Sequence, residues 1–479
     1  MDRLSFCLNF CAMLALSLAY PTPARARGSQ IDVWKSKTAA VVGDLIRAEL
    51  LVGSAVGLID HGDADISFYG KTTPHGNETL DETAVFEIAS LTKSFTGILL
   101  AEITGELEGL SVDDPVAKFV PELAGTFSGN ITLRQLARHQ SGLPVLPCNG
   151  EAENYCVRAA DPNPYLLYTA SQLLEFLKTF TRPDPGPYST EYSNLGFALL
   201  GYALERITHQ SFDELVKTRI TIPLHMNHTV VARPLSLSSI ATLIKGFNLV
   251  RQLAEHWQYD CFAPAAGLVS TIKDLMLYLK ANITPPHSAL GRAIKLSQNL
   301  ALGWDSQPGA TKILKNGESG GFSAMILLDP GQYFGSVALA NIESPYTDYI
   351  ALSLVDKKLP DLLGKEVPDS VLASALGSYA STEDANKQIW VTKPGKFLSI
   401  GWGDGDQWRL SAITETKFDA LDSDNSIGWN KVSFKTNSIG KITGLVVHFN
   451  DDFGHFNDET FVKMDPRYPT KWIEKLNRE

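Results

Sequence analysis

Before residue 356, the hydrophobic positions follow two kinds of pattern, which take turns along the chain. Short apolar runs bounded by polar turns predict strands, whereas apolar residues spaced three and four apart predict helices. Expected strands are residues 55–59 and 66–69, which form a hairpin around the polar turn 61–65, and residues 322–328 and 333–340, which are joined by Asp329, Pro330 and Gly331. Expected helices are residues 88–105, 131–140, 171–180, 194–207 and 270–281. Strands at both ends with helices between them predict an α+β fold, in which an antiparallel sheet is flanked by a helical block.

The pattern changes after residue 368. Short apolar runs at residues 387–392, 397–401, 408–413 and 445–449 alternate with clusters of Gly, Asn and Asp, which is typical of an all-β unit. The stretch before them is polar and contains proline, and we interpret it as a linker. The expected organisation is a first unit over residues 28–355, a linker over residues 356–368, and a small β-barrel or β-sandwich over residues 369–479.

The N-terminal residues 1–26 have the pattern of an export signal. A mostly apolar run at residues 4–20 is followed by Pro21 and by the small-residue sequence Ala24, Arg25, Ala26. Cleavage is therefore expected after Ala26, with the mature chain in the periplasm. The alternative is an uncleaved membrane anchor, although the run is shorter than the ~20 apolar residues that a span needs. No later segment is expected to span a bilayer.

Composition narrows the functional classes. The chain of 479 residues has 42 Lys and Arg against 53 Asp and Glu, a formal net charge of −11. Proteins that bind nucleic acid hold its phosphates with clustered Lys and Arg, so this balance argues against a nucleic-acid partner. Apolar residues make up 44% of the chain and charged residues 20%, as in globular proteins rather than disordered chains.

Cysteine usage argues against thiol chemistry. Cys7 and Cys11 lie in the predicted signal. Cys148 and Cys156 bracket a loop rich in turn residues, and in an oxidising compartment they are expected to form a disulfide. That leaves Cys261 unpaired. A buried, small apolar residue is the favoured interpretation of Cys261, so a cysteine hydrolase is not a main hypothesis.

The first candidate for chemistry is Ser90 with Lys93. On a helix, a spacing of three residues puts both side chains on one face within a turn. A desolvated lysine beside other cations can lose its proton near neutral pH and accept the proton of the serine hydroxyl. The same spacing recurs at residues 270–273, interpreted as a helix cap, and at residues 438–441, interpreted as a hairpin turn. A helix cap is also the competing interpretation of Ser90.

Two further motifs follow in order. Tyr192 and Asn194 form the only Tyr-x-Asn of the chain, and Lys315 with Gly317 comes just before the strand expected from residue 322. In this order the motifs make the chain resemble the superfamily of class C β-lactamases and low-molecular-mass penicillin-binding proteins, which includes D-alanyl-D-alanine peptidases. The resemblance runs from about residue 30 to residue 355, with supporting stretches at residues 110–116, 131–136, 141–144 and 267–271. The tail resembles the β domain that some members append.

The resemblance implies roles for the site residues. Ser90 would be the nucleophile, Lys93 its proton acceptor and Tyr192 a second base. A free phenol has a pKa near 10, so Tyr192 can accept a proton only if the Lys93 and Lys315 cations stabilise its phenolate. The residues expected to bind substrate are Asn194, Asn316 and Gly317. The oxyanion hole is expected from the backbone N–H groups of Ser90 and Glu318, and each such donor is worth about 3 kcal/mol in the transition state.

Two residues depart from the family pattern. Asn316 stands where the family usually has threonine or serine, whose hydroxyl helps to hold the substrate carboxylate; an amide can still donate, with a different reach. Glu318 stands where a small residue is usual, and it would place a carboxylate beside a site built for anionic substrates. Both departures weaken the β-lactamase interpretation and leave room for esters or for peptides that carry a positive charge.

Two rival kinds of hydrolase site are considered. Residues 317–321 form a Gly-x-Ser-x-Gly, but the nucleophile elbow of α/β-hydrolases needs a strand before it and a helix after it, and here a strand is expected next. The later histidines, His448 and His455, lie in the separate tail. For metal hydrolysis, the chain lacks a His-Glu-x-x-His motif, and His225 with His228 is interpreted as loop or surface. We therefore expect neither a metal nor a cofactor.

The resulting hypotheses are ordered. A serine hydrolase that acts through an acyl-enzyme on D-alanyl-D-alanine-type peptides, as carboxypeptidase or endopeptidase, comes first. A class C-like β-lactamase comes second, and an esterase or D-aminopeptidase third. From a different class, a penicillin- or cell-wall-binding module without turnover is considered, although every reactive position is filled. Expected partners are a small peptide, β-lactam or ester substrate, with peptidoglycan as a further partner.

Overall fold

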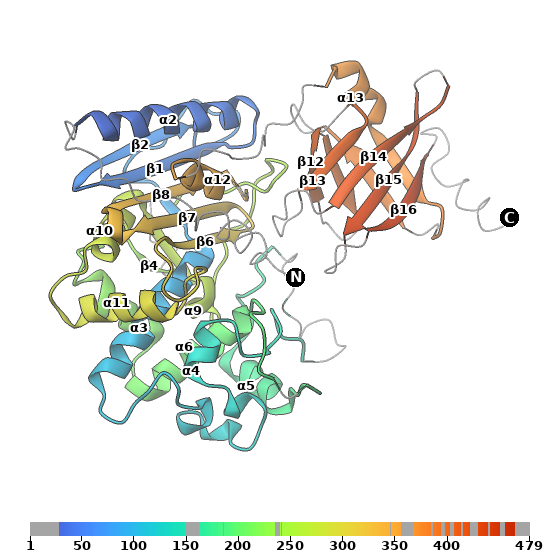
Figure 1. Ribbon diagram of the computed structural model, residues 1–479. Coiled ribbons are helices and arrows are strands. Elements are labelled where there is room, and N and C mark those ends of the chain that lie inside the picture. Colours follow the sequence, from blue (N-terminus) through green and yellow to red (C-terminus); the bar gives the residue numbers. More distant parts are fainter. Residues whose placement is uncertain are drawn as a thin grey trace.

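The computed structural model in Figure 1 describes most of the chain. The described residues are 28–149, 157, 162–184, 186–234, 240, 242–344, 346–355, 367–384, 387–393, 398–402, 407–412, 415–421, 430–438, 441–450 and 456–464. The predicted signal, Cys156 and residues 356–366 of the predicted linker lie outside them. The signal, the Cys148–Cys156 disulfide and the linker therefore stay predictions.

A five-stranded antiparallel sheet organises the first unit. Its strands are β1 (Gly53–Asp60), β2 (Asp63–Gly70), β6 (Ile313–Ser319), β7 (Phe322–Asp329) and β8 (Phe334–Ala340). Their order across the sheet is β2-β1-β8-β7-β6. Strands from both ends of the unit thus lie side by side, as the sequence predicts, and β6 forms an edge of the sheet.

The predicted N-terminal hairpin is confirmed, with a tighter turn than expected. β1 and β2 pair up to Asp60 and Asp63, which leaves His61 and Gly62 as the connection. Both have positive φ, 51° for His61 and 97° for Gly62, as a two-residue type I′ turn requires. The predicted turn at residues 61–65 is too long because its last residues already belong to β2.

Helices form the second part of the unit. They are α2 (Gly28–Arg47), α3 (Thr92–Glu106), α4 (Leu133–Ala137), α5 (Ala170–Thr179), α6 (Asn194–Thr208), α7 (Phe212–Val216), α9 (Ala263–Ala266), α10 (Ile272–Ile283), α11 (Ala289–Leu300) and α12 (Tyr346–Ser353). Short turns of 3-10 helix are η1 (Ala89–Leu91), η2 (Val116–Lys118), η3 (Pro121–Leu123), η4 (Ser128–Asn130) and η7 (Pro330–Gln332), and η6 (Lys217–Thr221) is a π-helical turn. The predicted helices at residues 171–180 and 194–207 are confirmed as α5 and α6. Those predicted at residues 88–105 and 131–140 start later than expected, because α3 begins after the 3-10 turn η1 and α4 covers only Leu133–Ala137.

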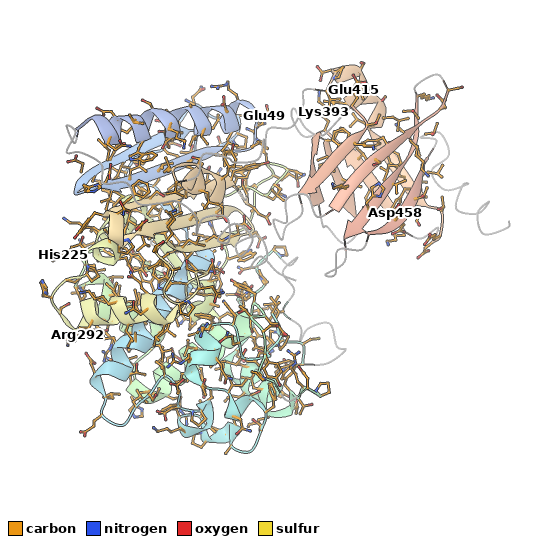
Figure 2. All side chains as sticks on the ribbon, in the orientation of Figure 1. Glu49, His225, Arg292, Lys393, Glu415 and Asp458 are labelled. Carbon is orange, nitrogen blue, oxygen red and sulfur yellow. The ribbon has the colours of Figure 1, made fainter. Side chains whose placement is uncertain are left out.

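Helices cover both faces of the sheet. Along β1, Val56 packs in a cluster with residues of α2 and α12, whereas Gly57 points at α10, where an added Cβ would lie 2.3 Å from the Met276 sulfur. All residues of β1 are therefore buried. Figure 2 shows side chains filling the spaces between the sheet and the helices.

A second, small sheet corrects one prediction. It consists of β3 (Val85–Glu87), β5 (Leu268–Thr271) and β4 (Val230–Val231), in the order β3-β5-β4. The helix predicted over residues 270–281 starts later, because Ser270 belongs to β5 and its hydroxyl bonds to Thr229 at 2.8 Å. Thr271 caps α10 by accepting a hydrogen bond from the Asp274 N–H at 3.2 Å. The cap interpretation therefore holds for Thr271 and is wrong for Ser270.

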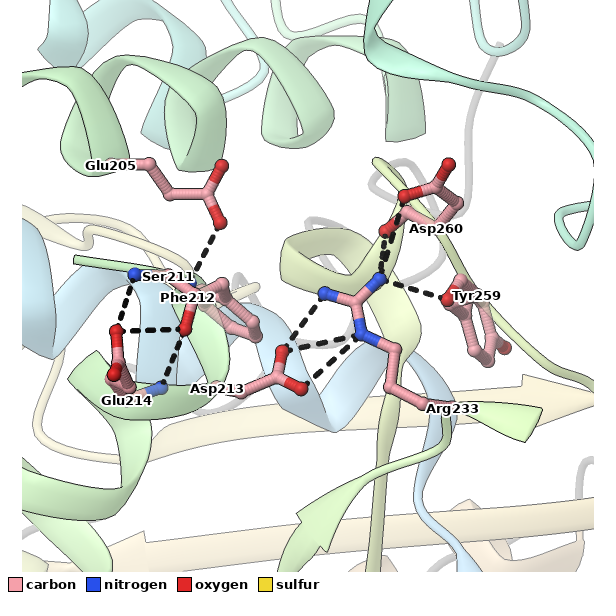
Figure 3. A network of polar contacts seen from close by, with 8 residues as sticks. All are labelled: Glu205, Ser211, Phe212, Asp213, Glu214, Arg233, Tyr259 and Asp260. Atoms are coloured by element: carbon pink, nitrogen blue, oxygen red, sulfur yellow. Dashed lines mark hydrogen bonds and ion pairs between the residues drawn. The ribbon is translucent and has the colours of Figure 1, made fainter. Parts of the chain in front are cut away.

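An arginine fixes the segment that leads to α9 (Figure 3). Arg233 donates to the carboxylate of Asp213 at 2.8 Å and to the carbonyl oxygens of Tyr259 at 3.0 Å and Asp260 at 2.9 Å. The guanidinium thus ties α7 to the segment before α9 with charge-assisted bonds. The position of α9 matters because its Ala265 carbonyl reaches the candidate site described below.

The C-terminal unit is a closed barrel rather than a sandwich. Its strands are β9 (Gly377–Ser381), β10 (Gln388–Thr392), β11 (Leu398–Trp402), β12 (Gln407–Ala412), β13 (Lys417–Leu421), β14 (Asn430–Thr436), β15 (Ile442–Asn450) and β16 (Phe456–Lys463). Each pairs with the next and β16 pairs with β9. The short helix α13 (Asp369–Ala375) contributes Leu372 and Ala375 to the barrel core. β14 and β15 pair as a hairpin, in which the Asn437 N–H donates to the Lys441 carbonyl oxygen at 2.9 Å. The expected turn at residues 438–441 stays a prediction, because residues 439 and 440 lie outside the described residues.

No helix among the described residues is long and apolar enough to cross a membrane. The unit boundaries at residues 355 and 369 stay predictions, since the segment that joins the units lies mainly outside the described residues.

Two glycines of α3 provide a matched test of packing. A Cβ at Gly97 would lie 2.0 Å from the Leu302 carbonyl oxygen, whereas a Cβ at Gly105 would have no neighbour within 4 Å. Gly97→Ala should lower the free energy of unfolding by ~1–3 kcal/mol because the helix must shift. Gly105→Ala should raise it by ~0.5 kcal/mol through helix propensity. Denaturant unfolding followed by circular dichroism measures both; an unchanged midpoint for Gly97→Ala would contradict the close approach.

Candidate active site

Ser90 lies in the turn η1, between strand β3 and helix α3. The preceding Ala89 has φ 43°, a left-handed conformation that is strained for a residue with a side chain and that clusters at functional turns. No side chain caps η1 or α3. The competing interpretation of Ser90 as a helix cap is therefore wrong.

The edge strand β6 passes directly beside this turn. A Cβ added to Gly317 would lie 2.3 Å from the Ile88 carbonyl oxygen and 2.8 Å from the Ser90 backbone nitrogen. The absence of a side chain thus lets the sheet edge approach the backbone of Ser90.

Lys93 is the second residue of α3 and is fully buried. Its Nζ lies 2.9 Å from the Ser90 hydroxyl oxygen, 2.7 Å from Asn194 Oδ1 and 2.8 Å from the Ala265 carbonyl oxygen. The amide and the carbonyl oxygens only accept. A neutral amine can therefore donate to these two and use its lone pair to receive the proton of the serine hydroxyl.

Burial lowers the pKa of Lys93 to about 8, with Lys315 acting in the same direction and Tyr192 against it. Desolvation disfavours the ammonium form of a buried lysine. The protein thus makes the neutral amine accessible near physiological pH, which a general base requires.

Tyr192 also reaches the Ser90 hydroxyl. Its hydroxyl oxygen lies 2.7 Å from the Ser90 hydroxyl oxygen, and the Nζ atoms of Lys93 and Lys315 lie 4.8 and 5.6 Å from its ring centroid. Burial raises the pKa of Tyr192, but the two cations outweigh burial and lower it to about 8. Because Lys93 and Tyr192 interact strongly, they titrate as one unit.

Asn194 links the serine pair to a residue that the sequence analysis missed. It is the first residue of α6, after Ser193, which caps the helix through a 2.9 Å bond from the Gly196 N–H. Asn194 Nδ2 donates to the Tyr165 hydroxyl at 3.2 Å. Burial raises the pKa of Tyr165, so Tyr165 stays a neutral phenol. It lies outside any periodic segment, so no local signal marks it.

His139 holds both flanks of Tyr192 and was also missed. Its carbonyl oxygen accepts the Glu191 N–H at 2.7 Å, and its Nδ1 accepts the Ser193 N–H at 3.0 Å. The imidazole packs against the Tyr192 ring in a tilted arrangement, with centroids 4.4 Å apart and an interplanar angle of 33°. Burial, helped by Lys93 and Lys315, holds the pKa of His139 well below its usual range, which keeps Nδ1 an acceptor.

The backbone of β6 presents alternate N–H groups at its outer edge. The Leu314 N–H bonds to Ser306 Oγ at 2.9 Å and the Asn316 N–H to Asp305 Oδ2 at 3.3 Å. Since strand residues alternate, the Glu318 N–H points to the same edge. This is the orientation that the predicted oxyanion hole requires.

Two acidic residues contact neighbouring side chains of β6. Lys315 Nζ lies 2.6 Å from Asp305 Oδ1, and Asn316 Nδ2 lies 2.8 Å from Asp348 Oδ2 on α12. The sequence analysis named neither aspartate. Asp348 meets Asn316 only because α12 packs on the sheet, a tertiary contact without a local signal.

A sequence profile of the β-lactamase family matches residues 39–357. The chain belongs to the β-lactamase family. The resemblance drawn from the three motifs is therefore confirmed. Among the described residues, the motifs converge on one place, which holds Ser90, Lys93, Tyr192, Asn194, Lys315, Asn316, Gly317 and the Glu318 backbone.

Known proteins similar to this β-lactamase family member include the following three. Protein flp of Staphylococcus aureus strain N315 is 27% identical over 351 residues, which are 68% of this chain and 66% of that protein, slightly less than two thirds of its length. A β-lactamase of Providencia stuartii is 26% identical over 246 residues, which are 51% of this chain and 58% of that protein. The solved structure of a β-lactamase/D-alanine carboxypeptidase from Pseudomonas syringae superposes with a TM-score of 0.57 and 19% identity, covering 68% of this chain and 100% of that one.

The remaining predictions on chemistry are placed as follows. Residues 317–321 do not form a nucleophile elbow, as expected, because strand β7 follows β6 directly and no helix comes between them. Cys261 is unpaired, and burial raises the pKa of its thiol, in agreement with an unreactive residue. No group of three or more metal-ligating side chains occurs in the part of the chain that the structure describes.

The shared titration of Lys93 and Tyr192 predicts a pH profile. kcat/KM should rise with pH through a midpoint near 8, as the pair loses its first proton. Lys315 lowers the pKa of both groups, so Lys315→Met should move the midpoint to higher pH whichever group is the base. Initial rates from pH 5.5 to 9.5 measure the midpoint, with the exposed Lys295→Met as control. An unmoved midpoint in Lys315→Met would refute the electrostatic role of Lys315.

His139 is predicted to act as a positioning residue for Tyr192. His139→Leu removes the acceptor for the Ser193 N–H and should lower kcat roughly tenfold to a hundredfold, with a shifted pH midpoint. Asn accommodates the left-handed φ of 56° and offers an amide oxygen, so His139→Asn should recover most of the loss. Equal kcat and pH midpoints for the two variants, at matched thermal stability, would argue against a positioning role of His139.

Proposed function

We propose that this protein is a serine hydrolase that acts through an acyl-enzyme on D-alanyl-D-alanine-type peptides. The observation that carries the proposal is the position of the Ser90 hydroxyl, 2.9 Å from Lys93 Nζ and 2.7 Å from the Tyr192 hydroxyl. Lys93 and Tyr192 both have a pKa lowered to about 8. A hydroxyl within hydrogen-bond distance of such groups can lose its proton to them as it attacks a carbonyl carbon.

The proposed steps balance as follows. Ser90 Oγ bonds to the carbonyl carbon of the substrate while its proton passes to the Lys93–Tyr192 pair. The backbone N–H groups of Ser90 and Glu318 stabilise the oxyanion. The pair then returns the proton to the leaving nitrogen or oxygen as its bond to carbon breaks. Water, deprotonated by the same pair, hydrolyses the ester and restores the Ser90 hydroxyl.

The names of similar proteins support this substrate class as a proposal. The Pseudomonas syringae protein is titled a β-lactamase/D-alanine carboxypeptidase and the Providencia stuartii protein a β-lactamase. Hydrolysis of β-lactams is accordingly the alternative. An esterase or D-aminopeptidase activity is favoured by a separate observation, the engagement of Lys315 and Asn316 by aspartates.

We further propose that the chain is exported to the periplasm, where peptidoglycan would be a partner. The support is the pattern of residues 1–26, which lie outside the described residues. A binding module without turnover is the less favoured reading, because every reactive position is filled by the residue that the mechanism needs.

Intact-mass spectrometry tests the acyl-enzyme. The protein is mixed, in separate time courses, with a penicillin and with the p-nitrophenyl ester of N-acetyl-D-alanine. A transient adduct should appear with the ester and map to Ser90. A lasting penicillin adduct would mark a slow-deacylating penicillin-binding peptidase, whereas consumption of the drug without an adduct would mark a β-lactamase.

The chain offers a matched control for this measurement. Ser90→Ala should abolish every adduct and lower turnover by on the order of 10⁴-fold. Ser438→Ala removes a serine with the same spacing to a lysine and should change nothing. An adduct that persists in Ser90→Ala would disprove the mechanism.

A further inference from the structure

We infer that a second cavity of the first unit binds a small zwitterion of dipeptide size, with the ammonium group of the ligand at Glu102 and its carboxylate at the N-terminus of α11. The cavity has a volume of about 450 Å³, which lies within the range of small-molecule sites. The end of α3, the π-helical turn η6 and the start of α11 line it. Glu102 follows Lys93 by nine residues in α3, a rise of about 14 Å along a helix. The cavity is therefore separate from the Ser90 site.

The carboxylate of Glu102 is buried without a full partner. Its side chain is 7% exposed and lines the cavity. Within the described part of the chain its Oε2 atom accepts no hydrogen bond, and Arg219 Nη1 lies 3.8 Å from it. A buried carboxylate is costly unless donors satisfy it. An ammonium group in the cavity would supply such donors.

Arg219 does not fill this role because a neighbour engages it. Its Nη1 lies 2.6 Å from Glu106 Oε2, one turn further along α3, so its short, charge-assisted contact is with Glu106. Burial raises the pKa of Glu102 to about 7, and the opposing effect of Arg219 does not cancel it. Arg219 belongs to η6, and π-helical turns are frequent at functional sites. One guanidinium thus serves two carboxylates, and Glu102 is the less satisfied of them.

The start of α11 offers the opposite preference. Its residues Ala289 and Leu290 line the same cavity. Ser288 caps this helix of 12 residues by accepting the Gly291 N–H at 3.2 Å. The first N–H groups of a helix, here those of Ala289 and Leu290, have no intrahelical partner. Together with the helix dipole, such donors favour a carboxylate.

The spacing of the two helices sets the length of the ligand. α11 packs along α3 (Figure 1), and the axes of packed helices lie ~8–10 Å apart. In a single amino acid the ammonium and carboxylate groups share one carbon atom, whereas in a dipeptide a peptide unit separates them. A dipeptide therefore reaches both ends of the cavity better than a single amino acid does.

Glycylglycine and two analogues isolate the two charges. Glycylglycine carries both, glycylglycinamide lacks the carboxylate, and N-acetylglycylglycine lacks the ammonium group. Ligand-observed NMR titrations use the full chain with Ser90→Ala, which prevents hydrolysis by the proposed mechanism. At pH 7.5, between the pKa of Glu102 and the value of ~8 for a peptide amino group, both partners are mainly charged. We expect glycylglycine to bind in the millimolar range, at least tenfold more tightly than either analogue at low ionic strength.

Two variants localise the two charges. Glu102→Gln keeps the shape of the side chain and should weaken glycylglycine at least tenfold, to the level of N-acetylglycylglycine. Ala289→Pro removes one N–H at the first helical position, where proline is tolerated, and should weaken glycylglycine severalfold without changing glycylglycinamide. Glu108→Gln removes an exposed negative charge just beyond α3, outside the cavity lining, and should change nothing.

Three results would overturn the proposed site. If glycylglycine binds Glu102→Gln as tightly as the parent, the ligand lies elsewhere. Equal binding of the three ligands would show that neither charge is recognised, and a lack of saturable binding at millimolar concentrations would remove the ligand altogether. Ratios between ligands on one preparation distinguish lost recognition from partial unfolding. Because the titrations involve no turnover, a failure of Ser90 acylation leaves this site unaffected, and loss of the site leaves the acyl-enzyme proposal unaffected.

Discussion

The buried amine of Lys93 is the constraint on which the site depends. An ammonium group without water is costly unless acceptors surround it, and three acceptors converge on this one: the Ser90 hydroxyl, Asn194 Oδ1 and the Ala265 carbonyl oxygen. They come from η1, α6 and α9, which lie far apart in the sequence. The amine therefore joins these elements, and their packing in turn desolvates the amine and lowers its pKa. The packing around Lys93 thus both holds these elements together and makes its amine a base.

The sheet contributes through its edge. Because β6 has a neighbour on one side only, its outer N–H groups are available to the loop at residues 305–306 and, at Glu318, to the position beside Ser90. An interior strand would have used these donors in the ladder. The antiparallel order that brings both chain ends together also leaves β6 at the edge. The fold thus provides the proposed oxyanion donors from the backbone, without a dedicated side chain.

Sequence spacing predicts the residues that act through local geometry. Ser90 with Lys93, and Tyr192 with Asn194, stand at helix starts, where spacing fixes which side chains neighbour each other. Partners that meet only through tertiary packing are not predictable in this way: Tyr165, His139, Asp305 and Asp348 have no periodic relation to the groups they contact. The same limit explains the fold. The hairpin and helices follow from their periods, whereas closure of the tail into a barrel depends on β16 pairing with β9, which no local pattern encodes.

The departures from the family pattern fall at one kind of position. Along β6, buried residues alternate with partly exposed ones. The buried set includes Lys315, which lies over the Tyr192 ring, and Gly317, which approaches the Ser90 backbone; both match the family. Asn316 and Glu318 belong to the alternate set and both depart from it. Along β6 the buried side chains thus match the family and the partly exposed ones depart from it, so this edge can vary while the Lys93–Ser90–Tyr192 arrangement stays intact.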